Sequence, residues 1–133
     1  RRRAVKRCGV FVTAGGRVGK SLVGGEESDF FERLRIANAK YFYVPDAVMY
    51  HIIPAEKLTM DYFVKLSYNV GVSKLRRAKY YCRVKRVRFV EVFKWIFTLA
   101  IAAWYGITLQ WFKGEYILIM RYHITRGLFD KNM

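Results

Sequence analysis

The sequence predicts an α/β fold in the first half of the chain, followed by helices of which one spans a membrane. Three observations favour this fold class. Apolar side chains recur at helical spacing after Gly24-Gly25, two short aromatic and β-branched runs follow, and residues 93–112 are almost wholly apolar. These observations divide the chain into four segments: residues 1–58, 59–92, 93–112 and 113–133.

A helix is expected from Glu26 to Asn38. Its buried face is formed by apolar residues at positions i, i+4 and i+7, namely Phe30, Leu34 and Ala37. The first turn contains three acids: Glu26, Glu27 and Asp29. Free N–H groups and the helix dipole favour acids there, so an acidic helix start is one interpretation of the motif. Clustered carboxylates can also bind cations or accept protons, so a functional site is the other interpretation.

Residues 41–44 and 47–53 are expected to form two strands, because both runs are rich in aromatic and β-branched residues. Pro45-Asp46 should turn the chain between them, and Pro54 should end the second strand. On that strand His51 shares one side with Met49 and Ile53. Taken alone, a histidine in this position is more often a packed side chain than a metal ligand.

Residues 59–92 are expected to form a basic amphipathic helical segment. Thr59 is suited to cap a helix that begins with apolar residues at Met60, Phe63, Val64 and Leu66. Eight basic residues then follow closely: Lys74, Arg76, Arg77, Lys79, Arg83, Lys85, Arg86 and Arg88.

Residues 93–112 are expected to form a transmembrane helix, because about 20 residues rise about 30 Å, which matches the hydrocarbon core. Lys94 can reach the interface from one end of this helix. A buried helix of a soluble domain is less favoured, because so short a chain offers little protein to surround a helix that is apolar all round. The positive-inside rule then places the preceding domain on the cytoplasmic side, and residues 113–133 should lie in the interface as an amphipathic helix.

The net charge of +15 requires an anionic partner, which nucleic acid, phospholipid or a phosphorylated substrate could supply. Most of the charge adjoins the predicted membrane helix, so membrane lipid is the expected partner and nucleic acid is not. Cys8 and Cys82 are too far apart in sequence to suggest a zinc knuckle or a disulfide framework. Residues 14–21 nearly match a phosphate-binding loop, but Gly24-Gly25 interrupts the helix that such a loop requires.

Several short motifs occur in a fixed order: Arg2-Arg3, Gly24-Gly25-Glu26-Glu27-Ser28-Asp29-Phe30, Arg33-Leu34, Tyr43-Val44-Pro45-Asp46-Ala47-Val48-Met49-Tyr50-His51, Pro54-Ala55-Glu56-Lys57-Leu58-Thr59, Tyr62-Phe63 and Gly71-Val72-Ser73. In this order and spacing, over about residues 1–77, the chain resembles the C-terminal half of a family 2 glycosyltransferase with the GT-A fold, which is Rossmann-like. Arg33 is expected to form salt links within the helix.

The resemblance implies an inverting glycosyltransferase that transfers a sugar from a nucleotide-sugar to a polysaccharide or lipid-linked acceptor. Glu27 aligns with the family's catalytic base, usually an Asp, and would deprotonate the acceptor hydroxyl. Glu26 and Asp29 would orient the acceptor or raise the pKa of the base. His51 stands where the family has a ligand of a divalent metal, magnesium or manganese, and Lys57 stands where a basic residue can pair with diphosphate.

The family's nucleotide-binding half, with its Asp-x-Asp motif, has no counterpart in these residues. The resemblance therefore implies an acceptor-side and membrane-anchoring part that is inactive without a donor-binding part. A non-catalytic basic membrane protein that binds anionic lipid or nucleic acid is the alternative hypothesis.

Overall fold

The computed structural model describes residues 5–6, 8–10, 22 and 24–131, and this part of the chain is helical, without a strand. It contains four α-helices and one short 3₁₀ turn: α2 (Glu26–Ile36), η2 (Ala55–Lys57), α3 (Met60–Tyr80), α4 (Val84–Ile107) and α5 (Trp111–Leu128). The prediction of an α/β fold, with the C-terminal part of a GT-A domain in residues 1–58, is therefore wrong for the described residues. The near match to a phosphate-binding loop lies outside them.

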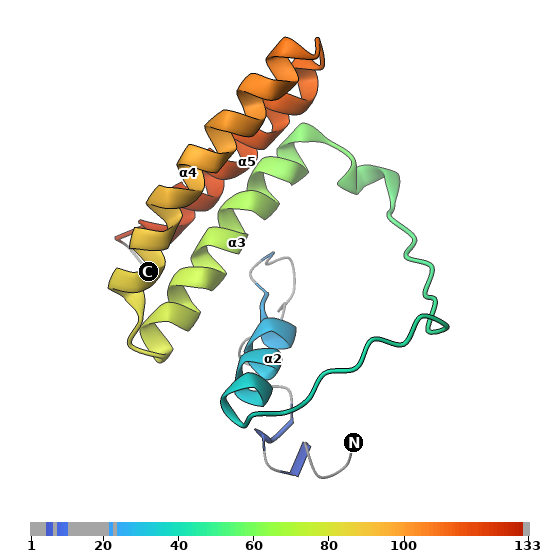
Figure 1. The fold of residues 1–133 in the computed structure, drawn as a ribbon, viewed down its shortest axis with the longest axis vertical. Coiled ribbons are helices and arrows are strands. Elements are labelled where there is room, and N and C mark those ends of the chain that lie inside the picture. Colours follow the sequence, from blue (N-terminus) through green and yellow to red (C-terminus); the bar gives the residue numbers. More distant parts are fainter. Residues whose placement is uncertain (1–4, 7, 11–21, 23, 132–133) are drawn as a thin grey trace.

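The two predicted strands form an extended segment that joins η2 to α2 in a wide arc away from the helices (Figure 1). Every side chain from Tyr41 to Ile53 is exposed, and Tyr50 is 92% exposed. Aromatic and β-branched residues favour strands because they fit a half-buried sheet surface, and here no sheet offers that surface among the described residues. The turn at Pro45-Asp46 does form, with the Ala47 N–H donating to the Val44 carbonyl at 3.2 Å.

Helix α2 begins at Glu26 as predicted and ends two residues before Asn38. Its expected buried face is only partly covered: Phe30 and Leu34 are half-buried, and Ala37 is exposed. Because no residue of α2 is fully buried, burial of apolar surface contributes little to its position, and polar contacts hold it against the other helices.

Helices α3, α4 and α5 pack together and contain the small apolar core (Figure 1). Thr59 caps α3 as predicted, since its hydroxyl oxygen accepts a hydrogen bond from the Tyr62 N–H at 3.3 Å. Helices α4 and α5 form an antiparallel pair, and α3 packs mainly against α5. The fully buried apolar side chains come from α3 and α5: Val72, Leu75, Ala78, Ile124 and Leu128.

The backbones of α3 and α5 touch at two glycines. A Cβ atom on Gly71 would overlap the Ile124 carbonyl oxygen and lie 2.9 Å from the Leu128 nitrogen. In the same way, a Cβ atom on Gly127 would overlap the carbonyl oxygen of Tyr68. Any side chain at either position would push the two helices apart, so the crossing requires glycine on both helices.

Helix α4 is long and apolar enough to cross a membrane, and it meets these criteria alone among the described helices. Its 24 residues correspond to about 36 Å at the helical rise. It differs from the predicted span of residues 93–112, because it begins at Val84 and the chain turns after Ile107. Leu109 adopts a positive φ of 58° in this turn, and α5 starts at Trp111. The predicted interfacial tail, residues 113–133, thus lies largely in α5, which packs against α3 and α4.

We predict that Gly71→Ala and Gly127→Ala each lower the free energy of unfolding by about 1–3 kcal/mol, because the added methyl group overpacks the crossing. Urea denaturation in neutral detergent, followed by circular dichroism, measures the change. Gly106→Ala is the matched control, since its Cβ would meet only the exposed Trp111 ring, at 3.2 Å, which can move. Equal stability of all three variants would contradict a backbone contact between α3 and α5.

Candidate functional site

Two cavities lie on either side of Lys74 and Arg77, which line both. The carboxylate pocket, of about 560 Å³, lies between the start of α2 and α3, and its lining residues are Leu22, Gly24, Gly25, Glu26, Glu27, Ser28, Leu66, Val70, Ser73, Lys74 and Arg77. The basic pocket, of about 370 Å³, lies between α2, α3 and α4, and its lining residues are Glu32, Arg35, Lys74, Arg77, Ala78, Tyr81, Arg83, Arg86, Val87, Val90, Glu91 and Lys94.

Gly25 sets the start of α2 against α3. Its φ of 135° is a conformation that side chains rarely adopt, and its carbonyl accepts the Asp29 N–H at 2.8 Å. A Cβ atom at this position would lie 3.8 Å from the Ser73 Cβ and 4.0 Å from the Arg77 Nη1. The Gly24-Gly25 turn therefore brings the first acids of α2 next to a cationic stretch of α3.

Glu26 and Glu27 line the carboxylate pocket together with Lys74 and Arg77. Glu26 is half-buried, and its Oε2 is shielded from solvent without a hydrogen-bond partner among the described residues. Glu27 is exposed at the same helix start. A carboxylate with a free oxygen can accept a proton from a hydroxyl group, and the neighbouring cations can bind an anionic group.

Asp29, the third acid of the motif, is occupied by structural contacts. It forms the predicted salt link with Arg33, at 2.9 Å, and accepts a hydrogen bond from the Tyr81 hydroxyl at 2.9 Å. Burial, together with this hydrogen bond, raises the pKa of Tyr81 to about 12. Asp29 therefore ties α2 to the turn after α3 and does not line either pocket.

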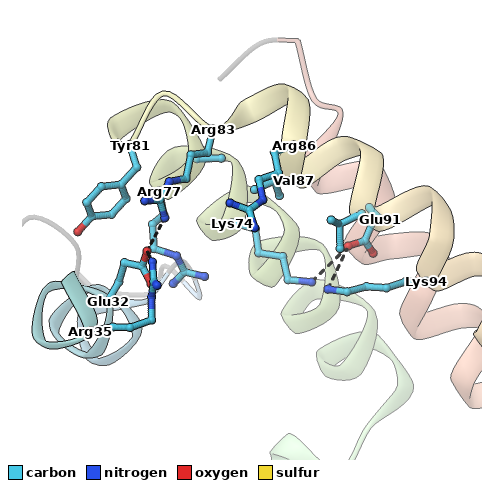
Figure 2. Close-up of a pocket in the computed structure, with 12 residues that line it drawn as sticks. Glu32, Arg35, Lys74, Arg77, Tyr81, Arg83, Arg86, Val87, Glu91 and Lys94 are labelled. Atoms are coloured by element: carbon cyan, nitrogen blue, oxygen red, sulfur yellow. Dashed lines mark hydrogen bonds and ion pairs between the residues drawn. The ribbon is translucent and has the colours of Figure 1, made fainter. Parts of the chain in front are cut away.

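Glu32 holds the other end of α2. Its carboxylate pairs with Arg35 at 2.8 Å and with Arg83 at 2.6 Å, so it joins α2 to the residue before α4 (Figure 2). The hydrogen bonds from Arg35 and then Arg83 outweigh the effect of burial and lower the pKa of Glu32 to about 2. Glu32 is therefore ionised at neutral pH and forms one wall of the basic pocket.

Glu91 is the most deeply buried charged residue described, with 2% of its side chain exposed. It pairs with Arg121 of α5 at 2.7 Å, with Lys74 of α3 at 3.6 Å and with Lys94 at 3.9 Å. The Arg121 Nε also donates to the Thr98 hydroxyl at 3.0 Å. Figure 2 shows Lys74 and Lys94 reaching toward Glu91 from two helices.

The sequence analysis did not single out Glu91, although its position in the sequence indicates a special role. Between Asp61 and Glu115 it is the only acidic residue, and it stands at the start of the apolar run. A single carboxylate there is expensive to bury unless cations surround it. The sequence does not show which cations these are, because Arg121 lies 30 residues further along the chain.

His51 and Lys57 lie apart from both pockets. Each is exposed, His51 on the extended segment and Lys57 in η2, and neither lines a cavity. In the part of the chain that the structure describes, no three His, Cys, Asp or Glu side chains gather as metal ligands would. The described residues around His51 therefore offer no such group of ligands, and no chemical step is assigned to a metal.

Comparisons with protein-family models, with curated proteins and with solved structures find no match to this chain. The candidate chemistry accordingly depends on the two pockets and on the order of the motifs that line them.

We predict that Glu91→Ala lowers the free energy of unfolding by about 3–5 kcal/mol, because it leaves the half-buried Arg121 without its carboxylate partner. Glu115→Ala is the control, since it removes an exposed acid from α5. Chemical denaturation in neutral detergent measures both variants. If the two substitutions had equal effects, Glu91 would contribute no more than a surface acid.

We also predict that the contact of α2 with Arg83, the residue before α4, weakens in acid. The folded pKa of Glu32, about 2, lies below its ordinary value of 4.5, so the ionised carboxylate is stabilising above pH 4.5 and this contribution is lost as the pH falls toward 2. The protection of the α2 amides against hydrogen exchange, taken relative to the intrinsic exchange rate at each pH, should therefore fall over that range. In Glu32→Gln this protection should be lower already at neutral pH and should change less on acidification; an identical pH profile of protection would contradict the assignment.

Proposed function

We propose that this chain is the acceptor-side and membrane-anchoring part of an inverting glycosyltransferase. One observation supports the proposal above the others. Two motifs of the resemblance that lie far apart in sequence, Gly24–Phe30 and Gly71–Ser73, both reach the carboxylate pocket, the second through Ser73 alone. The motif order was inferred from the sequence alone, and their meeting at one cavity is an independent spatial property.

In the proposed reaction, Glu27 acts as the general base. An acceptor hydroxyl in the carboxylate pocket loses its proton to the Glu27 carboxylate while its oxygen attacks the anomeric carbon of a nucleotide-sugar. The bond from that carbon to the diphosphate breaks, and the nucleoside diphosphate leaves with the electron pair. Glu26, with its free oxygen, orients the acceptor, and Lys74 and Arg77 supply positive charge beside the anionic leaving group.

The donor nucleotide-sugar requires a binding surface beyond the described residues, because the carboxylate pocket offers only the base and its cationic wall. Lys57 is kept as a candidate contact for the diphosphate of the donor. It lies on the exposed η2, so a contact with a separate donor-binding part is sterically open to it.

The proposal places the protein at a membrane, with the pockets on the cytoplasmic side. Helix α4 is long enough to cross, and only 11% of its most apolar window is buried. Four cations lie just before this helix or on its first five residues: Arg83, Lys85, Arg86 and Arg88. By the positive-inside rule this end of α4 faces the cytoplasm.

A non-catalytic basic membrane protein is the second candidate function, and the basic pocket favours it. Six cations and two acids line that cavity, which suits binding of an anion without any chemical step. Removing Glu27 should abolish sugar transfer if the first candidate is right and should have no effect if the second is right.

We predict that Glu27→Gln in the full-length gene product lowers the rate of sugar transfer by about 10²- to 10⁴-fold, because the amide cannot accept the acceptor's proton. Membranes carrying the protein are incubated with a panel of nucleotide-sugars, and release of nucleoside diphosphate is measured. Glu56→Gln is the matched control, since it removes an exposed acid in η2 outside both pockets.

Both variants should remain in the membrane fraction. If Glu27→Gln transferred sugar as fast as the control, the proposed base would be wrong. If the unsubstituted protein released nucleoside diphosphate from no member of the panel while its binding to anionic lipid depended on Lys74–Arg88, the non-catalytic alternative would replace the enzyme.

A further inference from the structure

Two arginines in the basic pocket form no ion pair with an acid among the described residues. Its two acids are already paired, Glu32 with Arg35 and Arg83, and Glu91 with Arg121, Lys74 and Lys94. Arg77 and Arg86 also line the cavity, and neither has an acidic partner within the described residues. Figure 2 shows both arginines beside the same hollow.

The cations of this pocket repel one another. Burial lowers the pKa of Lys74, and the nearby charges of Lys94 and Arg121 lower it further, against the opposing effect of Glu91. A bound anion would reduce this repulsion. Two guanidinium groups favour phosphate in particular, because each presents parallel N–H donors that match its oxygen atoms.

An apolar stripe begins at the same pocket. Val90 lines the cavity, and further apolar residues follow it along α4 at intervals of three or four, so they share one helix face: Val90, Phe93, Phe97, Ile101 and Trp104. All five side chains are exposed, by 42–69%. A ligand with its anionic head in the pocket could therefore place a hydrocarbon tail along the stripe.

We propose that the basic pocket binds the phosphate headgroup of an anionic lipid, with the lipid chains lying along the apolar stripe of α4. Arg77 and Arg86 bind the phosphate, and Lys74 and Lys94 add positive charge from the pocket wall. The combination of a cationic cavity and an adjoining apolar face distinguishes a lipid from a soluble phosphate. The inference rests on the membrane location in the proposed function, and it does not depend on sugar transfer.

The test uses the purified chain in neutral detergent, titrated calorimetrically with short-chain phosphatidate, whose headgroup is a phosphomonoester. The pair Arg77→Gln/Arg86→Gln should weaken binding by about tenfold or more, because it removes both unpaired guanidinium groups. The matched control is Arg76→Gln/Lys85→Gln, which removes the same net charge from two exposed residues outside both pockets. We expect that pair to change the Kd by less than about twofold.

Glycerol 3-phosphate separates the lipid from a soluble phosphate, because it carries the same headgroup without chains. It should bind at least about tenfold more weakly than phosphatidate. Equal affinity for the two ligands would overturn the lipid assignment. Equal losses of phosphatidate affinity in the two variant pairs would show that the overall positive charge attracts the lipid, and would overturn binding in the pocket. Circular dichroism checks the fold of each variant. If the pocket pair did not fold, the single substitution Arg86→Gln at an exposed residue, compared with Lys85→Gln, would decide between the same outcomes.

Discussion

Backbone contact between α3 and α5 at Gly71 and Gly127 determines where the other parts of the structure lie. The described residues bury only five apolar side chains completely, so the helices cannot depend on a large core for their positions. The backbone contact at the two glycines instead sets the distance between α3 and α5, because the helices cannot approach more closely and lose the contact if they move apart. With α3 and α5 fixed in this way, and α4 antiparallel to α5, the three helices meet around Glu91.

The cluster at Glu91 follows from that arrangement. Burial removes the water that hydrates the Glu91 carboxylate, and this desolvation costs free energy. The ion pairs with Arg121 and Lys74 offset that cost. Such a cluster contributes modest net stability, but it discriminates between arrangements, because any shift of α3 along α5 would separate the charges. It also fixes Lys74 between the two pockets, so the charge of one pocket influences the other.

Local signals in the sequence predicted the local structure well. The Thr59 cap, the start of α2 at Glu26 and the salt link of Arg33 depend on neighbouring residues alone, and each is present. The strands at 41–44 and 47–53 were wrong because strand formation depends on a partner that a single segment cannot supply. The end of α4 was misplaced because the residue with a positive φ in the turn is Leu109, a residue type that rarely adopts this conformation.

The candidate site was predicted only in part, because residues that are far apart in the sequence form it together. The acids at the start of α2 form a recognisable motif in the sequence. That they share a cavity with Ser73, Lys74 and Arg77 depends on where the tertiary fold places the start of α2 beside α3. The sequence analysis also treated Glu26, Glu27 and Asp29 as one group, whereas Asp29 bonds to Tyr81 and does not line the carboxylate pocket.

Because Lys74 and Arg77 line both cavities, an anion bound in the basic pocket would draw positive charge away from the carboxylates. The two proposals, although separable by experiment, would then be coupled through these two residues.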